Sequence, residues 1–181
     1  MRFKLAAVTL GIVVVASAFG ASTFTTATVS QSTSMDVVSD DRGLVGLAPG
    51  NASTDLVRTG TDGKLTIDFS DSAAAGFNGD STFQIGDNTS TPPTYAFNIT
   101  NNDGAAHTFD LSYAFDGTNP AGENVKLSVY NASGSHLATA SDEASATFDA
   151  GAGTTRYVVV TVDTSGLDNS STLSGTVQIN A

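Results

Sequence analysis

The sequence predicts an all-β protein, an antiparallel β-sandwich of jelly-roll or immunoglobulin-like type that follows an N-terminal signal helix. Apolar and polar residues alternate along most of the chain after residue 22, which is the periodicity of half-buried strands. Turn-forming Gly, Asn and Asp residues separate these segments at the spacing expected of about eight to ten short strands. No segment after the leader has the length and periodicity of an ordinary helix.

The first residues predict a signal peptide, residues 1–18. Arg2 and Lys4 precede an apolar run at residues 5–15, and small residues at 16–18 form an A-x-A cleavage site. We expect cleavage after residue 18, with residues 20 and 21 as alternatives, by a Sec-type route because no twin-arginine pair is present. An uncleaved anchor is the other reading, although a bilayer span needs about 20 residues. The leader therefore predicts a secreted, cell-surface protein without a membrane contact after cleavage.

The composition after the leader is strongly acidic. Five basic residues remain against 18 acidic ones, and five minus 18 gives a net charge of −13. An acidic, Lys-poor surface is typical of adaptation to high salt, where carboxylates hold hydration and their repulsion is screened. Such a surface argues against nucleic acid or anionic lipid as a partner. The chain has no Cys, so no disulfide stabilises it.

We expect an N-terminal arm at residues 19–38, followed by one sandwich domain at residues 39–181. Residues 22–38 are rich in Thr, Ser and Val and contain no Gly, Pro or basic residue, which favours extended chain. The odd-numbered positions are the more apolar, and Gln31 interrupts them, which predicts two short strands with a bend. The more apolar face of this arm carries Ala27, Val29, Met35 and Val37.

Turn residues define the first strands of the domain. Asp62 and Gly63 form a turn that tolerates positive φ, so residues 55–58 and 64–69 are expected to pair as a hairpin. The two prolines that end residues 87–93 cannot donate to a ladder, which makes this segment a loop. The other expected elements are a strand at residues 44–47, one helical turn at residues 73–75 and a strand at residues 82–85.

The clearest alternation lies in the second half of the domain. Residues 95–100 and 108–115 are expected to form a second hairpin, with Tyr95 among the aromatic residues that face one core. Residues 157–162 are apolar on both faces, which predicts a central strand or one covered by another chain segment. Gly175 marks a bulge or a close approach. Further strands are expected at residues 125–129, 136–140, 144–148 and 173–179.

Nothing in the sequence indicates an enzyme. His107 and His136 are the only histidines, and neither lies in a recognisable catalytic motif. The chain contains no G-x-S-x-G elbow, no H-E-x-x-H, no cysteine cluster and no P-loop. We therefore expect a protein without catalytic residues, without a bound cofactor and without a zinc site.

Calcium is the one ion for which the sequence offers ligands, because hard cations take carboxylate and carbonyl oxygens. None of the acidic turns has EF-hand spacing, so solvated acidic turns are the favoured interpretation and calcium the alternative. The turns concerned contain Asp40 and Asp41, Asp62 and Gly63, Asp68 and Asp71, and Asn102, Asp103 and Gly104.

Five N-x-S/T sequons match the acceptor pattern for N-glycosylation in an exported protein. Four of them fall in predicted turns or strand ends, and the fifth lies on the outward face of its strand by parity, so all five are expected to be exposed. The acceptor residues are Asn51, Asn88, Asn98, Asn131 and Asn169.

Three segments carry a resemblance to known proteins. The leader is followed at once by STFTTATVSQSTSMDVVSDDRGLVGL, and LTIDF and YAFNITNND come later, at residues 65–69 and 95–103. With these segments the chain resembles a group of haloarchaeal secreted proteins of uncharacterised function. The layout of signal peptide, N-terminal strand and jelly-roll body is similar, more distantly, to TasA/camelysin-type filament subunits and archaeal bundling pilins. The chain carries no protease signature in support of the peptidase label given to camelysin-type proteins.

The second resemblance implies donor-strand complementation, in which the N-terminal strand of each subunit fills a groove in the next one. The side chains that this resemblance would place in the groove are Phe24, Ala27, Val29, Met35 and Val37. A head-to-tail contact of this kind does not close on itself, so the subunits form a fibre, a homopolymer of this chain. The alternative is that residues 22–38 pair within their own sandwich as its first strand.

The leading hypothesis is therefore an exported, non-enzymatic structural or cell-surface protein, a filament or pilus subunit assembled by strand exchange. The second is a monomeric surface protein that binds carbohydrate or cell envelope. Tyr130 points outward by the parity of its strand and would serve that second role. The absence of Trp weighs against a surface on which sugars stack.

Overall fold

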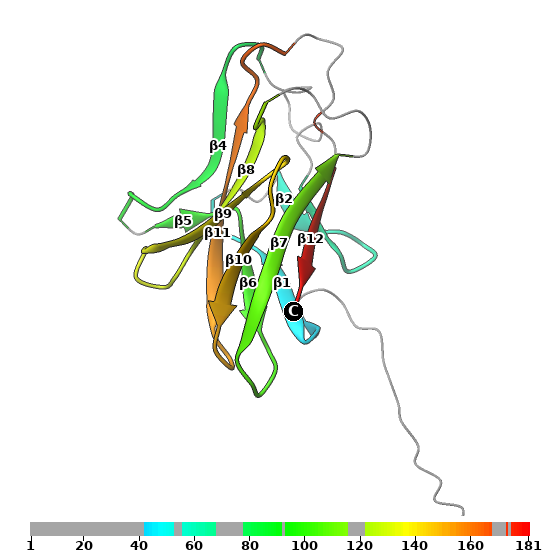
Figure 1. Ribbon diagram of the computed structural model, residues 1–181, viewed down its shortest axis with the longest axis vertical. Helices are drawn as coiled ribbons and strands as arrows, with labels where there is room; N and C mark the ends of the chain where they lie inside the picture. The colour runs from blue at the N-terminus through cyan, green and yellow to red at the C-terminus, as the bar shows by residue number, and fades with distance from the viewer. Residues whose placement is uncertain are drawn as a thin grey trace, which may run out of the picture. The chain divides into compact units, whose positions relative to one another are not determined.

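The computed structural model shows an all-β protein with antiparallel sheets, as predicted (Figure 1). It describes residues 42–52, 56–67, 78–91, 93–115, 122–167, 173 and 175–181, all within the compact unit Val37–Ala181. These residues form twelve strands rather than about eight to ten, and no α-helix. The strands are β1 (Val45–Pro49), β2 (Val57–Thr59), β3 (Leu65–Ile67), β4 (Thr82–Asp87), β5 (Thr94–Tyr95), β6 (Phe97–Asn101), β7 (His107–Phe115), β8 (Val125–Tyr130), β9 (His136–Ser141), β10 (Ala146–Ala150), β11 (Thr155–Asp163) and β12 (Gly175–Asn180).

Strand β11 lies at the centre of the larger sheet. It pairs with β8 along one edge, and along the other with β6 and then β4, all antiparallel. Beyond these strands, β1 pairs with β6, β5 with β4 and β9 with β8. Val158, Val160 and Val162 point into the core and are at most 1% exposed. The central position predicted for residues 157–162 is therefore confirmed.

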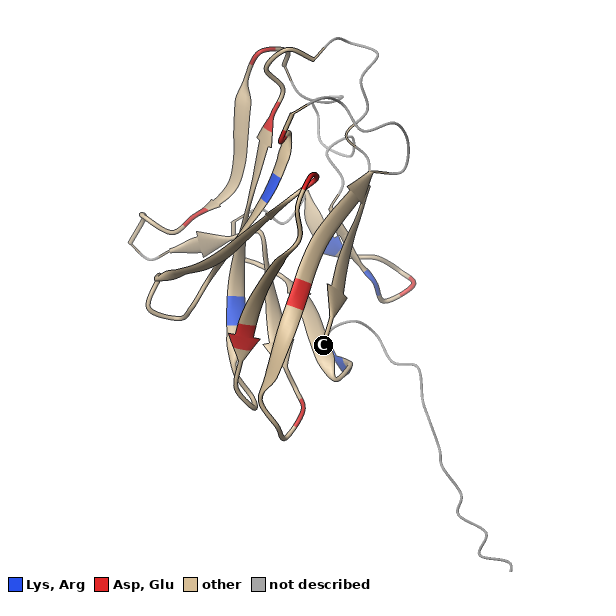
Figure 2. Cartoon of the chain, viewed as in Figure 1, with Lys and Arg blue, Asp and Glu red and all other residues tan. Residues whose placement is uncertain are grey.

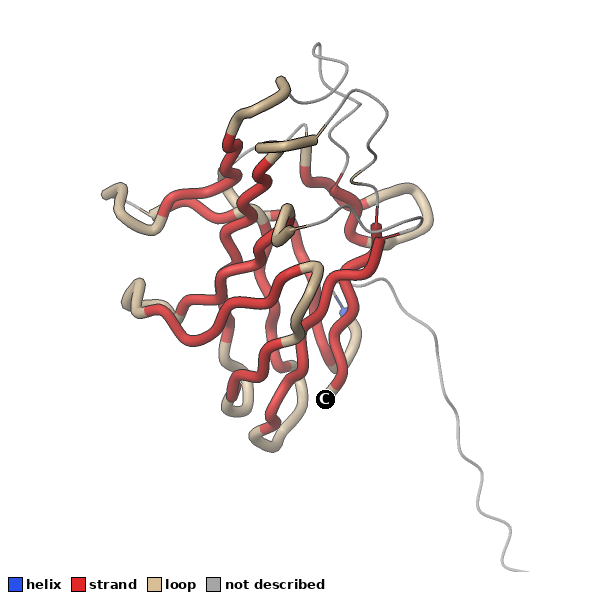
Figure 3. The backbone as a smooth tube through the Cα atoms, turned by 45° about the horizontal axis from the view of Figure 1, so that its top comes forward, coloured by secondary structure: helices blue, strands red, loops and turns tan. Residues whose placement is uncertain are grey.

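The smaller sheet has the order β10–β7–β12, and β2 pairs with β3 in a separate hairpin, as the Asp62–Gly63 turn predicted. Strands make up most of the described chain (Figure 3). Both sheets contribute alternate residues to one hydrophobic core, which is the parity that the sequence predicted for β7, β8 and β10. The largest fully buried side chains are Phe97, Phe109, Ile99, Leu111 and Leu127.

The predicted hairpin between residues 95–100 and 108–115 is wrong. Strand β6 lies between β1 and β11 in the larger sheet, so both of its edges are occupied. Strand β7 belongs to the smaller sheet, where it lies between β10 and β12. Buried Asn101 holds the crossover. Its Nδ2 donates to the carbonyls of Ala105, Ala150 and Gly151, at 2.8, 2.9 and 3.2 Å, and thereby joins the end of β6 to the end of β10.

Tyr95 is buried, at 8% exposed, but it lies outside the main core cluster that it was predicted to face. The chain leaves the edge of β11 at Gly86, where φ is 92°, and forms the short β4–β5 hairpin before it returns. Ala96 interrupts the strand and its amide donates to the Val158 carbonyl at 2.8 Å. The interruption reverses the parity, so Tyr95 stacks on outward-facing Tyr157, with ring centroids 4.4 Å apart. Alternation counted along the sequence has no means of locating such a break.

Two glycines allow backbone segments to approach closely. A Cβ on Gly175 would lie 2.4 Å from the Ala114 carbonyl oxygen and 2.7 Å from the Tyr113 hydroxyl, which confirms the predicted close approach. A Cβ on Gly50 would lie 2.0 Å from the Tyr95 carbonyl oxygen. Real side chains never come so near to backbone, so both positions require glycine.

The signal peptide, the arm and the helical turn predicted at residues 73–75 lie outside the described residues.

Candidate functional site

Strands β1 and β12 are edge strands in the described part of the chain, as are β5, β9 and β10. Among the described strands, β12 pairs only with β7 and β1 only with β6. Figures 1 and 3 both show the C-terminal end of β12 beside the start of β1. An unpaired strand edge presents free N–H and C=O groups that another strand can bind. These two edges therefore form the candidate site.

Burial of the core decreases toward these edges. Leu127 and Val158, in the interior of the larger sheet, are fully buried. By contrast, the apolar side chains nearest the open edges pack against the core but remain only partly buried. They are Val45 and Leu47 of β1, Leu65 and Ile67 of β3, Tyr113 and Phe115 of β7, and Leu173, Val177 and Ile179 at β12. One more apolar strand here would remove surface from water, which is worth about 25 cal/mol per Å² of apolar area.

The two open edges are not equally accessible. The β2–β3 hairpin packs beside β1 and partly covers its edge. Among the described strands, β12 packs extensively only against its sheet neighbour β7. Leu44, immediately before β1, is 73% exposed, the highest value among the large hydrophobic residues of the described chain. Among the described residues, the edge of β12 is therefore less covered than that of β1. The predicted donor residues Phe24, Ala27, Val29, Met35 and Val37 lie outside the described residues.

The sequon residues are less exposed than expected. Only Asn51 is exposed, while Asn88, Asn98 and Asn131 are half-buried and Asn169 lies outside the described residues. Asn51 also has a structural role, because its Oδ1 accepts from the Tyr95 amide at 2.9 Å and its Nδ2 donates to the Pro93 carbonyl at 3.3 Å. Asn98 is on the outward face of β6, as its parity predicted.

The two histidines lie apart, each with a near neighbour in sequence. His107 Nε2 is 2.5 Å from Asp103 Oδ2. This hydrogen bond is the main reason why the pKa of the Asp103 carboxyl is lowered. His136 Nε2 is 2.8 Å from Thr139 Oγ1. Among the described residues, no three His, Cys, Asp or Glu side chains group as metal ligands would. Of the predicted acidic turns, Asp62 Oδ2 pairs with Lys64 Nζ at 3.7 Å.

Most charged side chains of the described chain are acidic (Figure 2), and Lys126 is placed among three of them. Its Nζ is 2.9 Å from Glu123 Oε2, and Asp142 and Asp163 also attract it. The hydrogen bond to Lys126 lowers the pKa of Glu123, and the same bond raises the pKa of Lys126.

Replacing Lys126 with glutamine is expected to lower the melting temperature at neutral pH and low salt. Glu123 has a folded pKa below its ordinary 4.5, so its pairing stabilises the fold above that pH and is lost as the pH falls through the folded pKa. Lys126 has the opposite sign, so its contribution is lost as the pH rises through a folded pKa above 10.5.

Thermal melts across pH would show the variant and the wild type differing between these limits and converging in acid. The difference should also shrink in molar salt, where the screening length is about 3 Å. A difference that stays constant at low pH and in high salt would contradict an electrostatic origin.

Aromatic residues gather on the outward face of the larger sheet, and only Tyr130 among them was predicted to lie there. Tyr157 is paired across the ladder with Tyr130, and Tyr130 with His136, whose rings contact edge to face at 5.5 Å. Tyr130 is outward, as predicted. Burial raises the pKa of Tyr95, and the neighbouring Tyr157 raises it further. Only Tyr130 could be identified from parity, because the other contacts depend on which strands pair.

No protein family, no curated protein and no solved structure matches the chain. No helix in the described ranges is both long and apolar enough to cross a membrane.

Proposed function

We propose that the protein is an exported, non-enzymatic structural subunit, a β-sandwich of jelly-roll or immunoglobulin-like type that assembles by exchange of its N-terminal strand. The observation that carries this proposal is the open edge of β12, which lies beside apolar core side chains that are only partly buried. The leader predicts export, and the acidic surface in Figure 2 suits a protein that works at high salt.

The occupant of this edge is the arm of a second copy. Residues 22–30 contain no charge, and Ala27 and Val29 share one face of an extended chain. Main-chain hydrogen bonds to β12 would supply affinity, and the alternate side chains would set the register by packing near Val177 and Ile179. Because the arm and the acceptor edge are different surfaces of the chain, the contact repeats head to tail and builds a fibre.

Deletion of residues 19–38 is expected to abolish filaments while the remaining chain stays folded. The experiment images the mature protein by negative stain at molar salt and monitors folding by circular dichroism. A matched pair separates packing from charge: Val29→Asp should block assembly, whereas Ser30→Asp, on the opposite face, should permit it. Monomers whose arm resists protease would instead place the arm within its own subunit and overturn the proposal.

The absence of cysteine makes cross-linking a direct second test. The double variant Val29→Cys with Val177→Cys is expected to give a ladder of disulfide-linked oligomers on a non-reducing gel. The single variant Val29→Cys, as control, can give dimers only. A cross-link that forms within monomers would show a resident strand and contradict exchange.

A further inference from the structure

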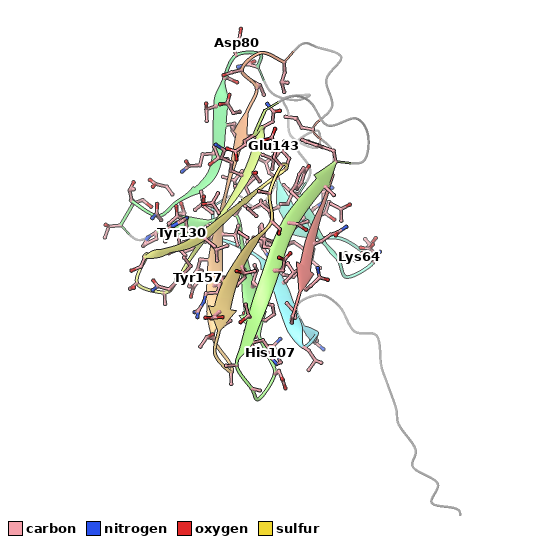
Figure 4. All side chains as sticks on the ribbon, viewed as in Figure 1. Lys64, Asp80, His107, Tyr130, Glu143 and Tyr157 are labelled. Atoms are coloured by element: carbon pink, nitrogen blue, oxygen red, sulfur yellow. The ribbon has the colours of Figure 1, made fainter. Side chains whose placement is uncertain are left out.

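The outward face of the larger sheet carries one continuous row of side chains. Cross-strand pairing aligns Asn98 of β6, Tyr157 of β11, Tyr130 of β8 and His136 of β9. Tyr95 extends the row by stacking on Tyr157 at an interplanar angle of 30°. The row thus holds three of the four tyrosines of the chain. Figure 4 shows Tyr130 and Tyr157 close together on the same side of the domain.

The outward face of the smaller sheet is different. Its two longest strands present short or polar residues there, and β7 contributes Thr108, Asp110, Ser112 and Ala114. The outward positions of β7 therefore include no aromatic ring. Tyr130 and Tyr157 are half-buried and His136 is exposed, so part of each of these three rings is accessible, whereas Tyr95 is buried at 8% exposed and packs on Tyr157.

Hydrogen bonds fix the backbone of Tyr95 at one end of the aromatic row. The β4–β5 hairpin leaves the sheet at Gly86 and carries Tyr95 over Tyr157. Asn51 Oδ1 accepts from the Tyr95 amide at 2.9 Å, and the Ala52 amide donates to the Tyr95 carbonyl at 3.0 Å. A surface that is ordered before binding loses little conformational entropy when a ligand arrives.

Neutral hydrogen-bonding groups flank the rings. Ser128 Oγ and Thr139 Oγ1 lie 3.1 Å apart on β8 and β9, and Thr139 also contacts His136 Nε2. The two loops at this end meet where Asn88 Nδ2 donates to the Gly134 carbonyl at 3.5 Å. None of the residues named in the row or its rim is a carboxylate or a basic side chain other than imidazole.

We propose that this row binds a neutral carbohydrate, with a pyranose ring stacked on the tyrosines and its hydroxyls bonded to the rim. Aromatic surface with a few placed polar groups is the usual lining of a ligand site. The net charge of −11 disfavours an anionic ligand, and the row has no carboxylate to pair with a cation. The site uses neither β12 nor the arm, so it does not depend on strand exchange.

Two sources could supply the sugar: a separate polysaccharide, or a glycan attached to this chain. Asn98 lies within the row and Asn131 follows Tyr130, and both belong to sequons. A glycan on either residue would place its sugars beside the same rings. The chemistry is the same in both cases, and the two sources are separated by comparing native with unglycosylated protein.

The test uses the full mature chain made in bacterial cytoplasm, where the sequons stay unmodified. Electrophoresis through gels containing mannan, β-glucan or galactan is expected to show retardation by at least one polysaccharide. Because the chain has no Trp, tyrosine fluorescence reports the same event when the matching oligosaccharide is titrated. Tyr130→Ala and Tyr157→Ala should each weaken binding about tenfold, whereas Tyr130→Phe and Tyr113→Phe should bind as the wild type does.

If the protein's own glycan fills the row, native protein will run unretarded until Asn98→Gln and Asn131→Gln remove the acceptors. That result and direct retardation of native protein both support the site and identify the source. The proposal is overturned if the unglycosylated chain shows no response to any of the three polysaccharides, or if both alanine variants bind normally. Fluorescence quenching by tetramethylammonium but by none of the sugars would assign the row to a cation and would also overturn it.

Discussion

Substituting alanine for Gly50 is expected to destabilise the protein by about 3 kcal/mol, the upper end of the cost of overpacking. The added methyl group would lie 2.0 Å from the Tyr95 carbonyl oxygen and 2.9 Å from the Ala96 carbonyl carbon. Both neighbours are backbone, and the Gly50 amide itself donates to the Ala96 carbonyl at 2.8 Å. The segment therefore has to move as a whole, and the β4–β5 hairpin would move with it.

Urea denaturation at constant high salt measures this effect. Gly104→Ala is the matched control, because a Cβ at Gly104 meets no atom within 4 Å, and it should change the unfolding midpoint little. Equal stability of the two variants would show that residues 50 and 95 do not approach as the structure has them. A Gly50→Ala variant that still folds should also bind the proposed sugar ligand more weakly, because the substitution displaces Tyr95.

Alanine at Asn101 is expected to cost about 2 to 3 kcal/mol, because buried acceptors would lose their donor. Asn101 is 1% exposed, and its Nδ2 serves three carbonyls while its Oδ1 accepts from the Asp103 amide at 3.0 Å. Some acceptors keep a second partner, since the Gly151 carbonyl also accepts from Thr154 Oγ1 at 2.8 Å. The cost therefore falls below three full desolvation penalties.

Asn102→Ala is the neighbouring control. Asn102 is exposed and makes one side-chain hydrogen bond, from Nδ2 to the Gly43 carbonyl at 2.8 Å, so its loss should cost less than about 1 kcal/mol. Calorimetric melts of both variants at one salt concentration give the comparison. Similar melting temperatures for the two variants would mean that the crossover from β6 to β7 does not depend on Asn101.

Alternation predicted most of the strands, because inward and outward positions are a local property of each strand. Strand pairing was harder to predict. Residues 95–100 and 108–115 look like partners because a short turn joins them, yet β6 pairs with β1 and β11, which are distant in sequence. Asn101 illustrates the same limit, since in sequence it resembles a turn residue and in the fold it is a buried cross-sheet donor.

The candidate sites divide in the same way. The extended character of residues 22–38 follows from composition, but the edge that would accept them is defined only by which strands end each sheet. Tyr130 was predicted to be outward from parity alone. Its neighbours in the row come from three other strands and one hairpin, so the site exists only after the larger sheet has formed.

The position of β11 in the chain also has a consequence for biogenesis. This strand joins β4, β6 and β8, yet it is the second-last strand to be synthesised. A ribosome-bound or partly translocated chain lacks the strand that unites the sheet, so its earlier strands have no common partner. Long-range pairing of this kind slows folding. If the chain is exported as proposed, this topology would delay folding of the larger sheet until the C-terminal strands have crossed the membrane.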